Sequence, residues 1–203
     1  IKVLNNGGNV LLLAHQLGKE NNSYELHFTP LFWSNSFFPG QNNKMLGMYI
    51  DKAHPALERF PTENFNNWQW QPVSKGRGFI INEHKELEPI VQPISDFHIN
   101  DKLASIFECK VGNGKMLVCG HDLTVNSPVA KQLKKSLLEY MGQSNFNPYY
   151  KLQEDEARKM FDYTPKAEAV LPAEFENALL YVSCGEEKKT PGGVPWRQAL
   201  DKI

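Results

Sequence analysis

The chain of 203 residues carries 22 Lys and Arg against 23 Asp and Glu, which gives a formal net charge of −1. Because basic residues are neither in excess nor clustered, the sequence gives no support to a nucleic-acid partner or a membrane-surface partner. Its hydrophobic content of 41% predicts a globular protein with a real core. No apolar run approaches the roughly 18 residues of a membrane-spanning helix.

The chain begins with IKVLNNGG, without an initiator Met or a signal peptide, so we expect a piece of a longer protein. After the turn residues 5–9, residues 10–14 form an apolar run that predicts a buried strand. His15 and Gln16 follow at the carboxyl end of that strand. Ligands of open α/β sheets bind at such ends, which makes this position of interest.

Residues 21–45 are rich in Asn, Phe and Pro, and we expect a long loop held against the core by its apolar side chains. Those side chains are Phe28, Leu31, Phe32, Trp33, Phe37 and Phe38. Residues 46–50 form a weak strand candidate, and a short helical turn is expected after Pro55. Two more short strands are expected at 79–81 and 90–94, where Pro93 favours an edge or a bulge.

Residues 104–142 are the best specified part of the chain. Residues 106–111 alternate in polarity, Gly112-Asn113-Gly114 tolerates the positive φ of a hairpin turn, and residues 115–120 return as an apolar run. That run is too continuous for a half-exposed strand, so we expect it to be buried on both faces. His121 and Asp122 stand at its carboxyl end.

A helix is predicted from Pro128, because Ser127 is a good N-cap and proline suits the first helical position. Apolar side chains recur at helical spacing up to Met141, and Gly142 stands where a helix often ends. A short helix is also expected at 153–161, and residues 178–182 favour a strand that adds to the sheet. We therefore expect an α/β domain over residues 1–148 and a C-terminal extension over 149–203, packed on the domain or partly mobile.

Nucleophilic hydrolysis is one candidate chemistry, with His121 as the base. It requires a Ser or Cys on a sharp strand-to-helix turn, yet no G-x-S-x-G or G-x-C-x-G occurs in the chain. Cys109 and Cys119 fall in the hairpin, where inert buried thiols are expected rather than nucleophiles. The sequence therefore assigns no catalytic residue.

Metal binding is a second candidate, with His54, Asp96, His98, His121 and Asp122 as conceivable ligands. None of them shows the spacing of a metal site, and there is no C-x-x-C. Histidines and aspartates at strand ends more often cap loops. We expect neither a metal nor another cofactor.

Carbohydrate binding is a third candidate. Trp68 and Trp70 could stack on sugar rings, and the neighbouring Asn and Gln side chains could bond hydroxyl groups. The competing interpretation is that the W-x-W rings pack into the core and against a neighbouring domain.

Five segments of the chain carry a family resemblance: FTPLFWSNSFFPGQ, HPALERFPTENFNNWQW, PIVQPISDFHIND, FECKVGNGKMLVCGHDL and PVAKQLKKSLLEYM. In this order they resemble the C-terminal region of bacterial family 2 glycoside hydrolases, a β-galactosidase-like group with many members in Bacteroides-type organisms. The resemblance covers about residues 10–148, and its most specific parts are HPAL-x-x-FPTE and WQW.

The resemblance implies a class I glutamine amidotransferase-like domain, a flavodoxin-like three-layer α/β sandwich with a mostly parallel sheet and an antiparallel edge hairpin. Amidotransferases place His-Pro-Glu after a late strand and a cysteine on a nucleophile elbow. Here His121-Asp122-Leu123 stands at the comparable place and the elbow is missing, which implies that the amidotransferase chemistry is lost. The two glycosidase carboxylates would lie in a separate barrel domain.

We therefore expect a non-catalytic accessory domain of a periplasmic or extracellular glycoside hydrolase. Its expected partners are the catalytic domain of that enzyme, a carbohydrate or a second copy of itself. Two alternatives stay open: a small hydrolase or metal-dependent enzyme that uses His98, His121 and Asp122, and a carbohydrate-binding module. The candidate ligand-binding residues are His54, Glu63, Trp68, Trp70, His98, His121 and Asp122.

Overall fold

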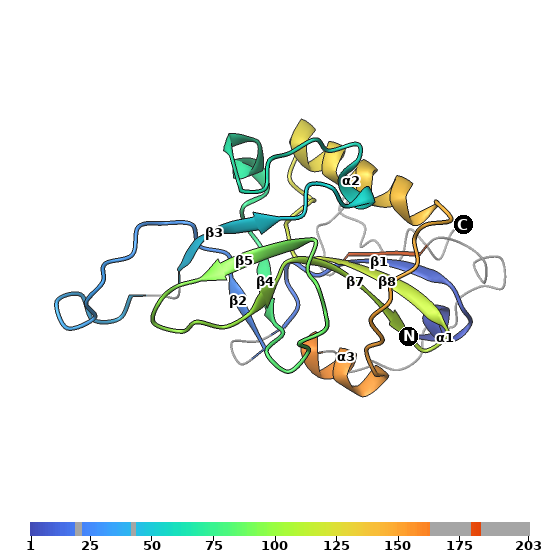
Figure 1. The fold of residues 1–203 in the computed structure, drawn as a ribbon, viewed down its shortest axis with the longest axis horizontal. Coiled ribbons are helices and arrows are strands. Elements are labelled where there is room, and N and C mark those ends of the chain that lie inside the picture. Colours follow the sequence, from blue (N-terminus) through green and yellow to red (C-terminus); the bar gives the residue numbers. More distant parts are fainter. Residues whose placement is uncertain (19–21, 42–43, 163–179, 184–203) are drawn as a thin grey trace, which may run out of the picture.

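The computed structural model describes residues 1–18, 22–41, 44–162 and 180–183. Within these residues the protein has a six-stranded mixed sheet with helices on both faces and a three-stranded antiparallel sheet beside it (Figure 1). The larger sheet has the strand order β3 (Met45–Ile50), β5 (Val91–Ser95), β7 (Ile106–Val111), β8 (Gly114–Cys119), β1 (Asn9–Leu13) and β9 (Leu180–Ser183). The smaller sheet has the order β2 (Ser23–Glu25), β4 (Arg77–Ile80) and β6 (Leu103–Ala104).

The prediction of a flavodoxin-like, mostly parallel sheet with an edge hairpin was wrong. The hairpin β7–β8 lies in the middle of the sheet, and the pairs β3–β5, β5–β7 and β7–β8 are all antiparallel. Among the strands that the structure describes, the parallel pairs are those of β1 with β8 and with β9. A two-residue turn can join only antiparallel strands, and in this chain the hairpin occupies the central positions that a doubly wound fold gives to parallel strands.

The hairpin itself forms as its sequence predicts. Val111 pairs with Gly114, and Gly112 between them has a φ of 58°, which a residue without a Cβ adopts most easily. Met116 and Val118 of β8 face one hydrophobic cluster, and Leu117 and Cys119 face another. The apolar run is therefore buried on both faces, as predicted.

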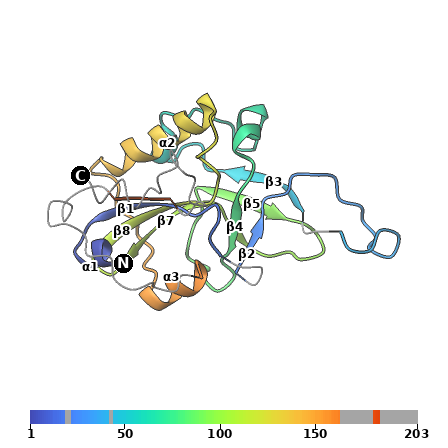
Figure 2. The same ribbon diagram turned by 180° about the vertical axis from the view of Figure 1, so that it is seen from behind.

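Helices cover both faces of the larger sheet. On one face lie α2 (Pro128–Met141) and the 3₁₀ helices η1 (Pro55–Leu57) and η2 (Trp68–Val73); α3 (Glu154–Met160) lies on the other, as the view from behind also shows (Figure 2). The N-terminal helix α1 (Lys2–Asn5) packs on the same side as α3. Ser127 caps α2 as predicted, since its hydroxyl accepts a hydrogen bond of 3.2 Å from the Val129 amide.

A close crossing of two chain segments determines where the polar residues beyond the sheet lie. The Arg77 amide donates to the Gly120 carbonyl at 2.8 Å, and the Asp122 amide donates to the Lys75 carbonyl at 2.9 Å. A Cβ on Gly76 would lie 1.9 Å from the Gly120 oxygen, and one on Gly120 would lie 2.1 Å from the Arg77 oxygen. Only glycine allows this approach, so the segment before β4 is fixed against the segment after β8.

The loop between β2 and β3 does not pack down as predicted. Phe28 and Leu31 are half-buried, but Phe32, Trp33, Phe37 and Phe38 are exposed by 38%, 67%, 71% and 58%. We call residues 29–41 the aromatic loop, which extends away from the sheets at the left of Figure 1. Its side chains contact one another instead of the core.

The C-terminal part of the prediction concerns residues 149–203. Leu152 and the apolar side chains of α3 pack into the cluster beneath the larger sheet, and β9 adds to the sheet beside β1 as expected. Residues 163–179 and 184–203 lie outside the described residues. In the described part of the chain, no helix combines the length and the apolar character needed to cross a bilayer.

Candidate functional site

A cleft of about 560 Å³ opens at the carboxyl ends of β1 and β8. We call it the strand-end cleft; residues 15–16, 25–29, 74–77 and Asp122 line it. The first and last of these segments follow neighbouring parallel strands, so their side chains converge at one edge of the sheet. The volume lies within the range of about 300–1,000 Å³ that small-molecule sites occupy.

His15 and Asp122 face each other in this cleft. The His15 Nε2 lies 3.7 Å from the Asp122 Oδ1, which is longer than a direct hydrogen bond. The His15 side chain is only 4% exposed, and its Nδ1 finds no hydrogen-bond partner among the described residues. Asp122 is held in place because its Oδ1 accepts bonds from the Thr124 amide and hydroxyl, at 2.9 and 2.6 Å.

Two cations line another side of the cleft. Lys75 and Arg77 flank Gly76, and the crossing with residues 120–122 fixes their backbone. No hydrogen bond or ion pair joins either side chain to another residue in the described part of the chain. Arg77 is half-buried and Lys75 is exposed. The cleft therefore holds two cations without a direct side-chain partner among the described residues, together with the two carboxylates of Glu25 and Asp122.

The carboxylate opposite Arg77 in the smaller sheet already has a partner. Glu25 stands opposite Arg77 in the β2–β4 register, but its Oε2 lies 2.9 Å from the His27 Nε2. Lys75 and Arg77 line the cleft as donors, and Glu25, Asp122 and the Gln16 amide line it with oxygen acceptors. Such a mixed polar lining suits a small ligand with hydroxyl groups and a negative charge.

His121 does not reach the cleft. It is fully buried, its Nδ1 lies 2.7 Å from the Val73 carbonyl and its Nε2 lies 3.0 Å from the Ser105 hydroxyl. A carbonyl only accepts, so the proton sits on Nδ1 and the Ser105 hydroxyl donates to Nε2. Burial lowers the pKa of His121 to about 4, which keeps the ring neutral.

Ser105 and His121 have the spacing of a nucleophile and its base, a pairing that sequence reasoning missed. Both side chains are 0% exposed, so no substrate reaches them in this structure. Cys119 is also fully buried, and desolvation raises its pKa to about 12. The geometry therefore gives His121 a structural role.

The other sequence-predicted residues lie apart from one another. Asp96 caps the backbone amides of His98 and Ile99, and the imidazole of His98 is exposed. His54 caps η1 through its Nδ1, which accepts from the Ala56 amide at 3.2 Å. Glu63 is exposed and lies 3.5 Å from the Lys52 ammonium.

Trp68 and Trp70 have opposite environments. Trp70 is 1% exposed, its Nε1 donates to the Thr62 hydroxyl at 2.8 Å, and its ring packs on Phe60 and His121. Trp68 is 90% exposed and remains available for an external contact. Among the described residues, no group of three or more His, Cys, Asp or Glu side chains is arranged to hold a metal ion.

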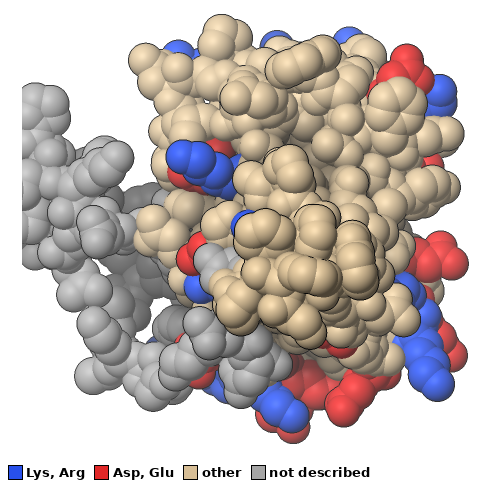
Figure 3. All heavy atoms as spheres, turned by 90° about the vertical axis from the view of Figure 1, so that its left-hand side faces the viewer, with Lys and Arg blue, Asp and Glu red and all other residues tan. Residues whose placement is uncertain are grey.

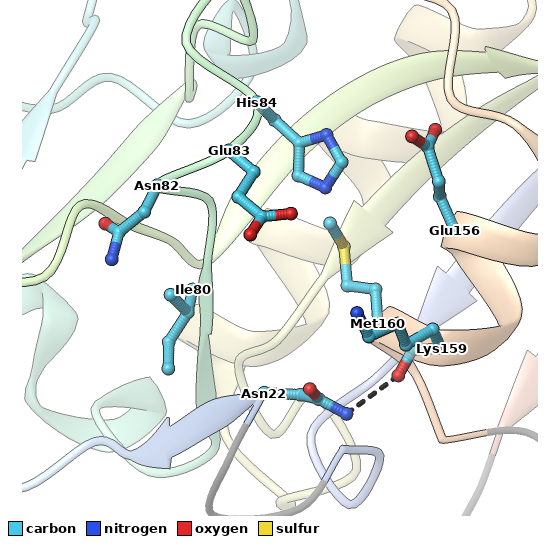
Figure 4. Close-up of a pocket in the computed structure, with 8 residues that line it drawn as sticks. All are labelled: Asn22, Ile80, Asn82, Glu83, His84, Glu156, Lys159 and Met160. Carbon is cyan, nitrogen blue, oxygen red and sulfur yellow. Dashed lines mark hydrogen bonds between the residues drawn. The ribbon is translucent and has the colours of Figure 1, made fainter.

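A second, smaller hollow of about 230 Å³ lies between the segment after β4 and α3. Figure 4 shows Glu83 and His84 on one side, and Glu156 and Lys159 on the other. Most of its polar groups serve structural bonds. Asn22 Nδ2 donates to the Lys159 carbonyl, His84 Nδ1 lies 2.9 Å from the Tyr150 hydroxyl and Glu156 accepts from the Gln153 amide at the start of α3. We therefore regard this hollow as a junction and not as a ligand site.

An exposed apolar surface lies at the end of the molecule that carries the aromatic loop. Gly47 of β3 pairs with Ile94 of β5, which brings Leu46 and Ile94 together at the loop-side ends of these strands. We define the apolar end as the following exposed side chains: Phe32, Trp33, Phe37, Phe38, Leu46, Ile94 and Phe97. Charged side chains lie mostly at the margins of the face seen in Figure 3.

Sequence reasoning located part of this site. It placed His15, Gln16 and Asp122 at strand ends, and the structure brings them together. It missed Glu25, His27, Lys75 and Arg77, which reach the cleft through a different sheet. The Lys-Gly-Arg sequence at 75–77 carries no motif, and only its glycine hints at a close backbone approach.

The fold and the cleft define a mixed α/β domain with a cleft at its strand ends and an apolar end beyond β3 and β5. The chain belongs to a family described as a domain of unknown function (DUF8487), whose family model matches residues 1–162. No curated protein matches the sequence.

Proposed function

We propose that this chain is a non-catalytic accessory domain of a β-galactosidase-like glycoside hydrolase and that it docks through its apolar end on the catalytic module of the same enzyme. The observation that carries the proposal is the exposure of the four aromatic-loop rings. Such a concentration of exposed aromatic surface is typical of an interface core.

The aromatic loop is organised for contact. Gln41 closes it, because its Oε1 accepts from the Phe32 amide at 2.9 Å and its Nε2 donates to the Phe32 carbonyl at 3.0 Å. Phe32 also packs edge-on against Phe37 and Phe38, with ring centroids 6.3 and 4.8 Å apart. A loop that is ordered before docking loses less conformational entropy when it binds.

Charge supports a protein partner at this end. Residues 28–41 contain no Asp, Glu, Lys or Arg. Interface cores are depleted of charged residues and enriched in Trp and Phe, whereas nucleic acids and anionic membranes select basic surfaces. In addition, β3 is an edge strand of the described sheet, and an edge of this kind is often covered by a neighbouring module.

The interior chemistry supports a non-catalytic role. The Ser105–His121 pair and Cys119 are fully buried. The resemblance of residues 10–148 to the C-terminal region of family 2 glycoside hydrolases supplies the identity of the partner, and a periplasmic or extracellular location belongs to the same proposal.

The test expresses this chain and the remainder of the natural polypeptide separately, then measures their association by calorimetry. We expect one-to-one binding that Trp33→Ala/Phe37→Ala weakens at least tenfold. The matched control is Tyr149→Ala, which removes an exposed ring outside the apolar end and should bind as the wild type does. Circular dichroism verifies that each variant is folded.

Three results would contradict the proposal. One is the absence of association, and another is unchanged binding by the double variant. The third is a self-associated chain that the double variant converts to monomers, because the partner would then be a second copy. The isolated chain should turn over neither aryl glycosides nor glutamine.

A further inference from the structure

The strand-end cleft has no part in the docking proposal. The side chains of Arg77 and Lys75 in this cleft indicate which class of ligand it could bind. Arg77 is half-buried and lines the cleft, and its side chain makes no hydrogen bond or ion pair with another described residue. A partly desolvated guanidinium favours a planar, bidentate acceptor such as a carboxylate. Lys75, on the other side of Gly76, adds a second positive charge.

The remaining polar groups suit hydroxyl groups. Asp122 and Glu25 are held by Thr124 and His27, and the oxygens of a carboxylate can accept more than one hydrogen bond. His15 Nε2 and Asp122 Oδ1 are 3.7 Å apart, so one hydroxyl placed beside the pair could contact both atoms.

One wall of the cleft is apolar. Phe28 is half-buried, packs on the cores of both sheets and lines the cleft together with Leu26. A sugar ring has apolar C–H groups that a fixed aromatic side chain can contact, whereas a free inorganic anion has none.

We propose that the strand-end cleft binds a small polyhydroxylated carboxylate of the size and chemistry of a hexuronic acid. The carboxylate lies against Arg77 and Lys75, ring hydroxyls contact Asp122, Glu25 and His15, and the apolar side of the ring faces Phe28. This inference does not depend on the docking proposal, because the residues that form the cleft and those that form the apolar end are different.

The test uses the whole chain and measures binding of glucuronate and galacturonate by calorimetry at low ionic strength. Glucose, galactose, acetate and inorganic phosphate serve as comparison ligands. We expect saturable uronate binding, at least tenfold tighter than binding of the corresponding neutral sugar or of acetate. The affinity should fall as salt is added, because the contact involves charges near the surface.

Variants assign the contact to the cleft. Arg77→Met should weaken uronate binding at least tenfold, whereas Arg59→Met should leave it unchanged, since Arg59 does not line the cleft and pairs with Glu139. Amide chemical shifts of residues 75–77 and 121–122 should move with uronate concentration.

Four results would overturn the proposal. They are absence of uronate binding, equal affinity for the neutral sugar, unchanged binding by folded Arg77→Met, and phosphate binding as tight as uronate binding. The last result would show that the cleft recognises a simple anion and makes no use of the hydroxyl groups. Loss of docking by Trp33→Ala/Phe37→Ala should leave uronate affinity intact, which separates the failure of either proposal from failure of the other.

Discussion

The Nε2 of His121 and the hydroxyl of Ser105 form a hydrogen bond of 3.0 Å in the fully buried interior, where it joins the end of β8 to the residue before β7. The other ring nitrogen binds the Val73 carbonyl at the end of η2. One histidine thus connects three segments that are distant in sequence. In a water-excluded interior this connection is strong only while the imidazole stays neutral.

Acid should therefore destabilise the protein through His121. The pKa of its imidazole is about 4 in the folded state against an ordinary value of 6.5, so the unfolded chain binds the proton first as the pH falls. The free energy of unfolding should fall between about pH 6.5 and pH 4 and level off below, by on the order of 3 kcal/mol from this group. Urea denaturation at a series of pH values measures the slope.

His121→Gln isolates this contribution. The variant should be less stable at neutral pH by about 1–3 kcal/mol, because buried partners lose their bonds, and its stability should depend less on pH in the same window. Burial also lowers the pKa of His54, which accounts for part of the remaining slope. His98→Gln, at an exposed histidine, is the matched control and should keep the wild-type slope. Identical slopes in the wild type and His121→Gln would refute the assignment.

Gly120 should be intolerant of any side chain. A Cβ there would lie 2.1 Å from the Arg77 carbonyl oxygen, which is backbone and cannot rotate away. Gly120→Ala should destabilise the fold by roughly 1–3 kcal/mol and displace Lys75 and Arg77 from the cleft. Gly142→Ala is the control, because its Cβ would lie at an ordinary 3.5 Å from the nearest atom and its φ is −82°. Thermal denaturation of both variants measures this difference. Equal midpoints for Gly120→Ala and Gly142→Ala would contradict the prediction that Gly120 tolerates no side chain.

The buried thiols should be inert. Cys109 and Cys119 are free, fully buried, and have pKa values that desolvation raises to about 12. At pH 8 only roughly one thiol in ten thousand would be ionised, even before access is considered. In a Cys184→Ser background, a disulfide reagent should label neither cysteine in the folded chain and both after unfolding. Rapid labelling of one thiol in native buffer would show that the interior of the hairpin opens readily.

Local chemistry explains what the sequence could predict. The Gly112 turn, the Ser127 cap and the double-sided apolar run of β8 each depend on neighbouring residues, and all three appear in the structure. The order of the strands in the sheet could not be predicted in this way, because it depends on contacts between segments that are distant in sequence. The prediction placed the hairpin at an edge, yet β5 and β1 pair on either side of it.

The residues of the candidate site also fall into two groups: those that a local pattern predicts and those that depend on contacts between distant segments. His15 and Asp122 follow two strands that pair in parallel, so a rule about strand ends found them. Lys75 and Arg77 reach the cleft only through the crossing at Gly76 and Gly120, which no local pattern predicts. The aromatic loop shows a different limit of prediction from sequence. Its composition indicates strong packing, but composition alone does not distinguish a ring buried in its own core from one presented to a partner.

Gln41 should control the order of the aromatic loop. Its amide makes two hydrogen bonds with the Phe32 backbone and a third, of 3.0 Å, with the Asn35 side chain, so it takes the place of a paired strand residue. Gln41→Ala should speed hydrogen exchange at the Phe32 amide and lower the docking affinity, because the partner would then have to order the loop. The global stability should change by less than about 1 kcal/mol, since the loop is exposed.

The matched control for this change is Gln71→Ala, which removes an exposed amide from η2 and lies outside the loop. It should leave both the Phe32 exchange rate and the docking affinity at wild-type values. If Gln41→Ala exchanges faster at Phe32 but docks equally well, loop order contributes nothing to binding. The rings would then act only through the area that they bury, and affinity should follow the Trp33 and Phe37 substitutions alone.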